Sequence, residues 1–299
     1  MRNSLRALAW LAALATVPGL AAALDWRLEL FSHFLPLYLL LTLAGLGLAR
    51  YWPERLALLL AALAQLGWLL LALQPGKIDA VVSRGMPLQL IAFNGYVNNP
   101  DRVLAAQALL REGPELLLLT EADAGWQAAL QPLAAAMPHG CARHDDSPFG
   151  IALLAKQPLR HCAVKTVAGL PGWLPYVCAE LASGLVVYGI HPPPPLGAEL
   201  AGWRDAMLDG LAGQIAAETA PVLVLGDFNS TPYSPVYLRF RQRARLQETG
   251  AAGWPSWGPP GWPALLPLDR VLARGVRVNA RIGPALGSDH RLLRLGVGG

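Results

Sequence analysis

The sequence is poor in charged residues, which make up 15% of its 299 residues, whereas soluble domains carry about 25%. Hydrophobic residues make up 54%. This composition excludes a disordered chain, because disorder combines low hydrophobicity with high charge. The net charge of +4 is small, so a strongly basic surface for nucleic acid is not indicated.

Cysteine is scarce as well. The three cysteines are Cys141, Cys162 and Cys178, and the absence of a Cys-x-x-Cys pair gives no sign of a zinc site. Their apolar surroundings favour buried thiols. The alternative is one disulfide with a leftover thiol, which would place the domain outside the cytoplasm.

Charge is missing above all from the first quarter of the chain. Residues 7–24, 30–49 and 56–74 contain no Asp, Glu, Lys or Arg, and each run approaches the ~20 residues that an α-helix needs to cross a bilayer. The sequence therefore predicts three transmembrane helices. The alternative is that the first run is a signal peptide whose cleavage leaves two helices.

The short loops between these runs predict their orientation. Arg2 and Arg6 precede the first run, and Arg50 and Arg55 bracket the loop between the second and the third. The positive-inside rule places these arginines in the cytoplasm. Residues 76–299 then lie on the outer side of the membrane, whether or not the first run is cleaved.

The chain divides into a membrane anchor (1–75), a linker (76–87) and a domain (88–299) in which short apolar strands alternate with helices. We expect an α/β sandwich in which helices cover packed sheets.

Residues 254–267 are rich in Pro, Gly and Trp and predict a rigid loop. Such a loop would be structural, enter the bilayer interface or line an apolar substrate groove. Helices are expected at 99–112, 124–136, 198–218 and 235–243, and strands at 88–93, 116–120, 150–155, 162–167, 174–181, 185–190, 222–226, 268–273, 276–282 and 291–295.

Polar side chains stand where the apolar strands end. Because a buried strand carries the residue at its end to the rim of the sheet, these side chains are the candidate functional groups. Asp227 and Asn229 are two residues apart and point the same way on an extended backbone. The candidates are Asn94, Glu121, His191, Asp227, Asn229, Asp289 and His290.

The segments AFN, LLTEAD, GIALLAK, GIH, GDFNSTP, LDRVL and GSDHRLL resemble, in this order, the endonuclease/exonuclease/phosphatase superfamily with its deoxyribonuclease-I-like fold. The resemblance covers about residues 88–296. It implies a four-layer α/β sandwich, with two packed mixed sheets flanked by helices, which three transmembrane helices would precede here.

The resemblance also implies a divalent cation, Mg²⁺ with Mn²⁺ as the alternative. Glu121 is similar to the family's principal metal-binding carboxylate, Asn94 to the amide beside the metal and the phosphate, and Asp289 to a second carboxylate on the metal side. These groups suit Mg²⁺, which takes oxygen ligands from one or two carboxylates, waters and substrate phosphate.

Five further residues match the catalytic positions of the family. Asp227 resembles the acid that orients or deprotonates the attacking water, and Asn229 the donor that stabilises the phosphorane oxygen. His290 resembles the imidazole that contacts the scissile phosphate, and Asp269 the acid that orients this imidazole. His191 matches the strand-end residue that contacts phosphate or assists the leaving group.

The sequence thus predicts a membrane-anchored, metal-dependent phosphoesterase that hydrolyses a phosphoester or pyrophosphate. The anchored arrangement resembles a bacterial subgroup that includes the VanJ-like membrane proteins, which implies a lipid-linked or prenyl pyrophosphate at the outer face of the plasma membrane. One alternative is an outward-facing nuclease, which is less favoured because Lys and Arg exceed Asp and Glu by only two in residues 76–299. The other is an inactive phosphate-binding module, against which the full set of residues argues.

Overall fold

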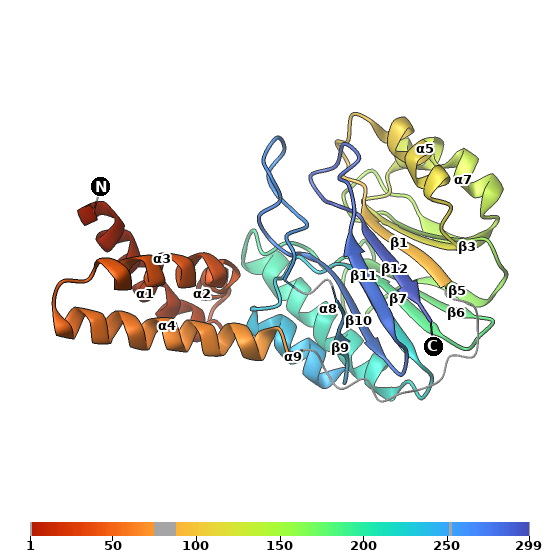
Figure 1. Cartoon of the computed structure of the whole chain (residues 1–299). Helices are drawn as coiled ribbons and strands as arrows, with labels where there is room; N and C mark the ends of the chain where they lie inside the picture. The colour runs from red at the N-terminus through yellow and green to blue at the C-terminus, as the bar shows by residue number, and fades with distance from the viewer. Residues whose placement is uncertain (1, 75–87, 251–252, 299) are drawn as a thin grey trace. The chain divides into compact units, whose positions relative to one another are not determined.

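The computed structural model describes residues 2–74, 88–250 and 253–298 and is traced in Figure 1. The chain forms two compact units, of which the first comprises residues 1–74 with 230–239 and the second residues 75–229 with 240–299. The linker expected at 76–87 lies outside the described residues.

The first unit is built from helices. Asp25 caps α2 by accepting a hydrogen bond from the backbone N–H of Arg27 at 2.8 Å. Pro36 and Pro53 occupy the first turns of α3 and α4, where a missing N–H costs nothing. The elements are α1 (Arg2–Leu20), α2 (Trp26–Glu29), the 3₁₀-helix η1 (Leu30–Phe34), α3 (Leu35–Leu48) and α4 (Trp52–Ala72).

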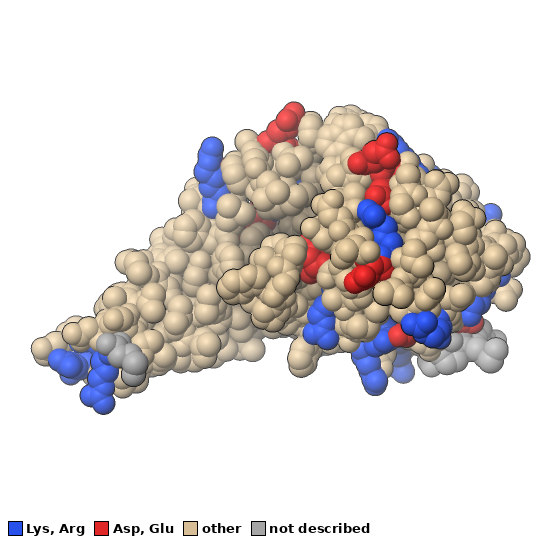
Figure 2. All heavy atoms as spheres, turned by 90° about the horizontal axis from the view of Figure 1, so that it is seen from above, with Lys and Arg blue, Asp and Glu red and all other residues tan. Residues whose placement is uncertain are grey.

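Two segments among the described residues, Trp26–Leu48 and Trp52–Ala72, are long and apolar enough to cross a membrane. The prediction of three such helices is therefore corrected to two. The residues of the first run do form a helix, but α1 begins at Arg2 and includes Arg6, so polar residues occupy its first turns. Figure 2 shows mostly uncharged side chains over the visible surface of this unit.

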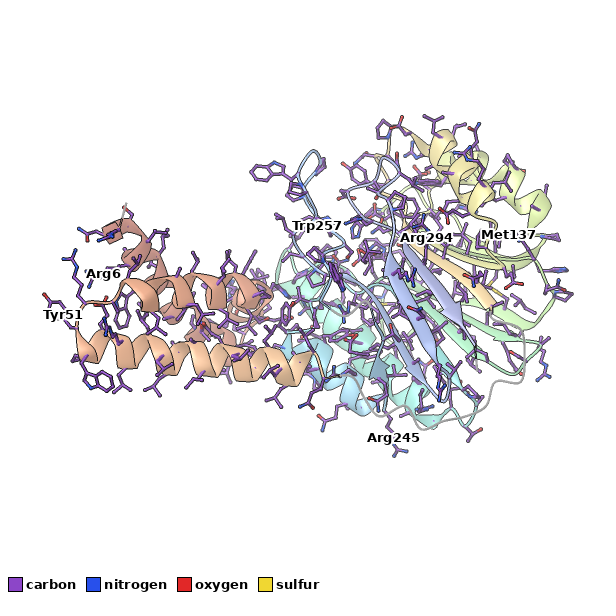
Figure 3. All side chains as sticks on the ribbon, in the orientation of Figure 1. Arg6, Tyr51, Met137, Arg245, Trp257 and Arg294 are labelled. Carbon is purple, nitrogen blue, oxygen red and sulfur yellow. A yellow bond between two sulfur atoms is a disulfide. The ribbon has the colours of Figure 1, made fainter. Side chains whose placement is uncertain are left out.

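Small and polar residues hold the first unit together. A Cβ added to Gly45 of α3 would lie 2.1 Å from the Cβ of Ala9 in α1, so glycine permits this close approach. Arg6 pairs with Glu54 at 2.7 Å, and Figure 3 shows Arg6 and Tyr51 at the same end of the unit. The basic residues near the N-terminus and those near the α3–α4 loop therefore share one end.

The second unit contains two mixed sheets. Within them β1 pairs with β2 and β7 pairs with β8 in parallel, whereas the other neighbours are antiparallel. One sheet has the order β11 (Val278–Ile282), β12 (Leu293–Val297), β1 (Leu88–Asn94), β2 (Leu116–Thr120), β4 (Ile151–Ala155), β3 (His139–Arg143). The other has the order β5 (Leu159–Thr166), β6 (Pro175–Leu181), β7 (Val186–Ile190), β8 (Val222–Asp227), β10 (Asp269–Arg274), β9 (Gln247–Glu248).

Alternation along β2 shows why the sheets pack as they do. Leu116 and Leu118 join the core between the two sheets, whereas Leu117 and Leu119 pack toward the helices on the outer face. A strand that is buried on both faces has a continuous run of apolar residues in its sequence. The expected α/β fold, with two mixed sheets flanked by helices, is confirmed (Figure 1).

The helices that follow α4 are α5 (Arg102–Glu112), α6 (Ala124–Ala129), α7 (Gln131–Ala136), α8 (Ala198–Ala217) and α9 (Pro235–Arg243).

Two predicted helices differ in detail. The single helix expected at 124–136 is broken at Leu130 into α6 and α7, with Pro132 in the first turn of α7. The helix expected from Asn99 begins at Arg102, with Asp101 at the N-cap position. The Asn99 side chain accepts the backbone N–H of Asp101 at 2.8 Å and donates to the carbonyls of Gly95 and Leu286.

A disulfide joins Cys141 of β3 to Cys162 of β5, with 5.7 Å between the Cα atoms. These are edge strands of different sheets, so the bond ties the two sheets together at one side of the sandwich. Cys178 is a free, half-buried thiol, and burial raises its pKa. The alternative of one disulfide with a leftover thiol is thus the arrangement in the structure.

We predict that Cys162→Ser lowers the free energy of unfolding by about 3 kcal/mol, because the disulfide closes a loop of 21 residues in the unfolded chain. Urea denaturation of the full chain in detergent, monitored by tryptophan fluorescence, measures this loss of stability. Cys178→Ser is the matched control and should change stability by less than about 1 kcal/mol. Equal losses in the two variants would contradict the prediction.

Candidate active site

The predicted site residues lie at one edge of the second unit because of the strand directions. Asn94 ends β1 opposite Thr120 of the parallel β2, so Glu121 follows beside it. Asp227 ends β8 and stands opposite Asp269, the first residue of the antiparallel β10. The polar ends of both sheets therefore meet at the same rim, as carboxyl ends of parallel strands do.

Asp227 is the centre of the cluster and is 1% exposed. Its Oδ2 lies 3.0 Å from the Asn94 amide nitrogen, 3.5 Å from His191 Nε2 and 3.4 Å from His290 Nε2. Its Oδ1 accepts the backbone N–H of Asn229 at 2.8 Å. Burial raises the pKa of Asp227, but the two histidines and the N–H donor outweigh burial and lower it well below the usual range. The carboxylate is therefore ionised at neutral pH.

His290 is held between two carboxylates. Its Nδ1 lies 2.7 Å from Asp269 Oδ2, while its Nε2 faces Asp227. Burial lowers the pKa of His290, but the charges of Asp269 and Asp227 outweigh burial and raise the pKa to about 10. The imidazole is therefore a cation at neutral pH, and its contact with Asp269 favours one orientation of the ring.

Asn94 and Glu121 form the other side of the cluster. The Asn94 amide donates to Glu121 Oε1 at 3.0 Å, and the backbone N–H of Val97 donates to Oε2 at 2.7 Å. Glu121 has a φ of 56°, in the left-handed region, which non-glycine residues rarely adopt. This backbone turn is a strained feature of the kind found at functional sites.

The donor set suits one hard cation. Among the described residues no three His, Cys, Asp or Glu side chains gather into a metal cage, but Mg²⁺ is held by one or two carboxylates and completes its shell with water and phosphate. The carboxylate of Glu121 meets that need. The Asn94 nitrogen faces the cluster, and its carboxamide oxygen accepts the backbone N–H of Tyr96 at 3.0 Å, so only the second lone pair of that oxygen would serve a cation. Burial raises the pKa of Asp289, and the charge of Glu121 adds to this shift although His290 opposes it. Bound positive charge would relieve that repulsion.

His191 contributes a second buried imidazole. Its Nε2 faces Asp227, and its ring lies 5.8 Å from that of Phe149. Burial lowers the pKa of His191, but Asp227 outweighs burial and raises it. Its Nδ1 is buried without a hydrogen-bond partner in the described part of the chain, so this nitrogen is available to a substrate oxygen or a water.

Asn229 reaches the same edge in a different way. Its backbone has a φ of 47°, and its side-chain amide donates to the carbonyl of Pro192 at 2.9 Å. The prolines that follow His191 thus hold Asn229 in place. One amide hydrogen is used by this bond, and the other is left for a ligand.

Sequence reasoning missed two residues, Ser256 and Trp257. Ser256 Oγ accepts the backbone N–H of Asp269 at 2.9 Å, and Trp257 Nε1 donates to Asp289 Oδ2 at 3.0 Å. Figure 3 shows Trp257 at the base of its loop. No local pattern marks either residue, because each acts on a carboxylate that is distant in sequence.

Comparison with known families matches residues 91–290 to the Endonuclease/Exonuclease/phosphatase family. The match covers more than half of the chain and includes the whole cluster. The chain therefore belongs to the endonuclease/exonuclease/phosphatase family, as the sequence motifs predict. Comparison with curated proteins finds no match.

Solved structures share the fold. Sphingomyelinase C from Streptomyces griseocarneus is 17% identical with a TM-score of 0.54, and the match covers 71% of this chain and 99% of that one. Truncated TDP2 from Caenorhabditis elegans is 14% identical with a TM-score of 0.54, covering 73% and 100%. The human Nocturnin catalytic domain with bound sulfate is 19% identical with a TM-score of 0.54, covering 71% and 94%.

We predict that Ser256→Ala lowers the free energy of unfolding by about 2 kcal/mol, because it leaves the buried N–H groups of Leu268 and Asp269 without their acceptor. Urea denaturation of the full chain measures the loss. Ser183→Ala removes a hydroxyl from an exposed turn and should change stability by less than about 0.5 kcal/mol. If the two variants were equally stable, the bonds to Ser256 would contribute nothing to stability.

Proposed function

We propose that this protein is a membrane-tethered, divalent-metal-dependent hydrolase of a phosphoester or pyrophosphate bond. The observation that carries the proposal is the ionised Asp227, buried between His191 and His290 beside the Glu121–Asn94 pair. Membership of the family supports the reaction type. Among the described residues no Ser or Cys side chain is hydrogen-bonded to His191 or His290, and the Ser288 hydroxyl donates to the Asn94 carbonyl at 2.8 Å, which supports water as the attacking group.

Each side chain has a role that follows from its charge and position. When bound, Mg²⁺ or Mn²⁺ would neutralise phosphate charge, and Glu121 and Asn94, with Asp289 nearby, would hold it. Asp227 is ionised and accepts a proton or hydrogen bond from the attacking water. Phosphoryl transfer depends mainly on such positioning and charge stabilisation.

The two imidazoles and Asn229 face the phosphoryl group. The cationic His290, oriented by Asp269, places positive charge where the phosphoryl oxygens gain negative charge. The unpartnered Nδ1 of His191 is suited to contact a second phosphate oxygen or the leaving group. The remaining amide hydrogen of Asn229 is a donor for the pentacoordinate transition state.

We favour a lipid-linked or prenyl pyrophosphate as the substrate. Two apolar helices precede the site in sequence, and a sphingomyelinase, an enzyme named for a lipid phosphoester, shares the fold. Nucleic acid is the alternative. It is less favoured because affinity for nucleic acid depends largely on Lys and Arg contacts to phosphates. In this chain Lys and Arg exceed Asp and Glu only slightly, with a net charge of +4.

We further propose that residues 1–75 anchor a catalytic domain at 88–299, through a linker at 76–87, to the outer face of a bacterial plasma membrane. Arg50 and Arg55, which flank the loop between the two apolar helices, mark the cytoplasmic side, so the second of these helices returns the chain to the outer side. The disulfide between Cys141 and Cys162 supports an oxidising compartment.

We predict that the full chain in detergent with Mg²⁺ releases phosphate from a prenyl pyrophosphate and that EDTA abolishes this release. Asp227→Asn should lower kcat by about 10³-fold, since it removes the negative charge that orients water and holds the two imidazoles. Asp145→Asn changes an acid in a turn outside the cluster and is the matched control. Plasmid nicking without release of lipid phosphate would favour the nuclease alternative.

We predict that alkaline phosphatase fused after residue 299 is active in a bacterial cell and that green fluorescent protein fused there is dark, because both report export. Replacing Arg50 and Arg55 by Glu weakens the cytoplasmic signal and should reduce phosphatase activity several-fold. The matched control replaces Arg243 and Arg245 by Glu. A fusion that is fluorescent and has no phosphatase activity would overturn the proposed topology.

A further inference from the structure

A cavity of about 320 Å³ lies beside the catalytic cluster. One wall comes from the loop at residues 258–264, and the other from residues 285–291, including Ser288, Asp289 and Arg291. Asp289 belongs to both the cavity and the cluster, so whatever fills the cavity lies next to the reacting group. Figure 1 shows this loop, between β9 and β10, projecting from the second unit.

The two walls differ in chemistry. The loop wall consists only of Gly, Pro, Ala and Trp residues, among them Pro260, Trp262 and Pro263, so no side chain on it is charged. The opposite wall includes Arg291, whose guanidinium Nε donates to the carbonyl of Gly283 at 2.9 Å. No acceptor is recorded for its terminal nitrogens among the described residues. Arginine binds phosphate through such paired donors.

The loop is held in shape before any ligand binds. Trp257 exchanges backbone hydrogen bonds with Leu266 at 2.9 Å, and the N–H of Gly258 donates to the Asp289 carbonyl at 3.1 Å. A Cβ on Gly258 would lie 2.3 Å from the carbonyl oxygen of Pro263, so only glycine allows this closure. The side chain of Trp262 is nonetheless 70% exposed, which leaves a large apolar surface beside the cavity.

From these observations we propose that the cavity binds the apolar chain of the substrate, while Arg291 binds its phosphate. This deepens the proposed function and rests on it, because it specifies an amphiphilic phosphoester or pyrophosphate. The volume is at the lower end of the ~300–1,000 Å³ typical of ligand pockets. The cavity therefore holds only the carbons nearest to the phosphate. Trp262 and Arg291 are the specificity-determining residues.

The test compares methyl and hexyl pyrophosphate, which are both soluble as monomers, using the full chain with Mg²⁺. Each methylene that the cavity buries should raise kcat/KM about fourfold, so the hexyl compound should be preferred at least tenfold. Trp262→Ala should lower kcat/KM for the hexyl compound at least fivefold more than kcat/KM for the methyl compound. Arg291→Gln should lower both about tenfold.

Trp254→Ala is the matched control, because Trp254 lies in the same loop and is 66% exposed but does not line the cavity. This variant should leave kcat/KM unchanged for both substrates. Equal use of the two substrates by the native chain, or equal losses in the two tryptophan variants, would overturn this inference and leave the proposed function standing. If the native chain hydrolysed neither substrate nor a prenyl pyrophosphate, the proposed function itself would fall.

Discussion

The buried contact of Asp227 with two imidazoles is the constraint on which the site depends. A carboxylate that is buried away from water needs a charged or hydrogen-bonding partner, because an isolated buried charge is costly. Here His191 and His290 supply the pairing, and Asp269 holds the second imidazole from behind. The geometry exists only because β8 and β10 are aligned so that Asp227 and Asp269 stand opposite each other.

That alignment depends in turn on the packing of the two sheets. Leucines along β2 fill the space between the sheets and beneath the outer helices at the same time, so a slip of one residue would exchange the two faces. At one side of the sandwich, Cys141 and Cys162 connect the edge strands covalently. The catalytic rim is thus supported by a core that tolerates little rearrangement.

The loop at residues 253–267 contacts two carboxylates of the cluster and also lines the cavity. Ser256 and Trp257 at its base bind Asp269 and Asp289, whereas Trp262 farther along lines the cavity. A change in the base of the loop should therefore affect Asp269 and Asp289, whereas a change farther along should affect the cavity.

Much of this architecture could be predicted from the sequence. Apolar runs ending in Asn94, Glu121 and Asp227 indicated buried strands with functional groups at the rim, and motif order indicated the family. Local sequence patterns predicted less of the structure where contacts between distant residues determine it. Leu130 breaks a predicted helix ahead of Pro132, and α1 has too many polar residues in its first turns to qualify as a membrane span.

The sequence by itself determined which chemical groups are present and on which strands they lie, because strand periodicity and the residues that end each strand are local properties. Only the tertiary structure decided that Asp227 lies between two imidazoles, that Cys141 joins Cys162, and that Ser256 and Trp257 bind Asp269 and Asp289. Those pairings join residues far apart in the chain, and the packing of two sheets brings them together.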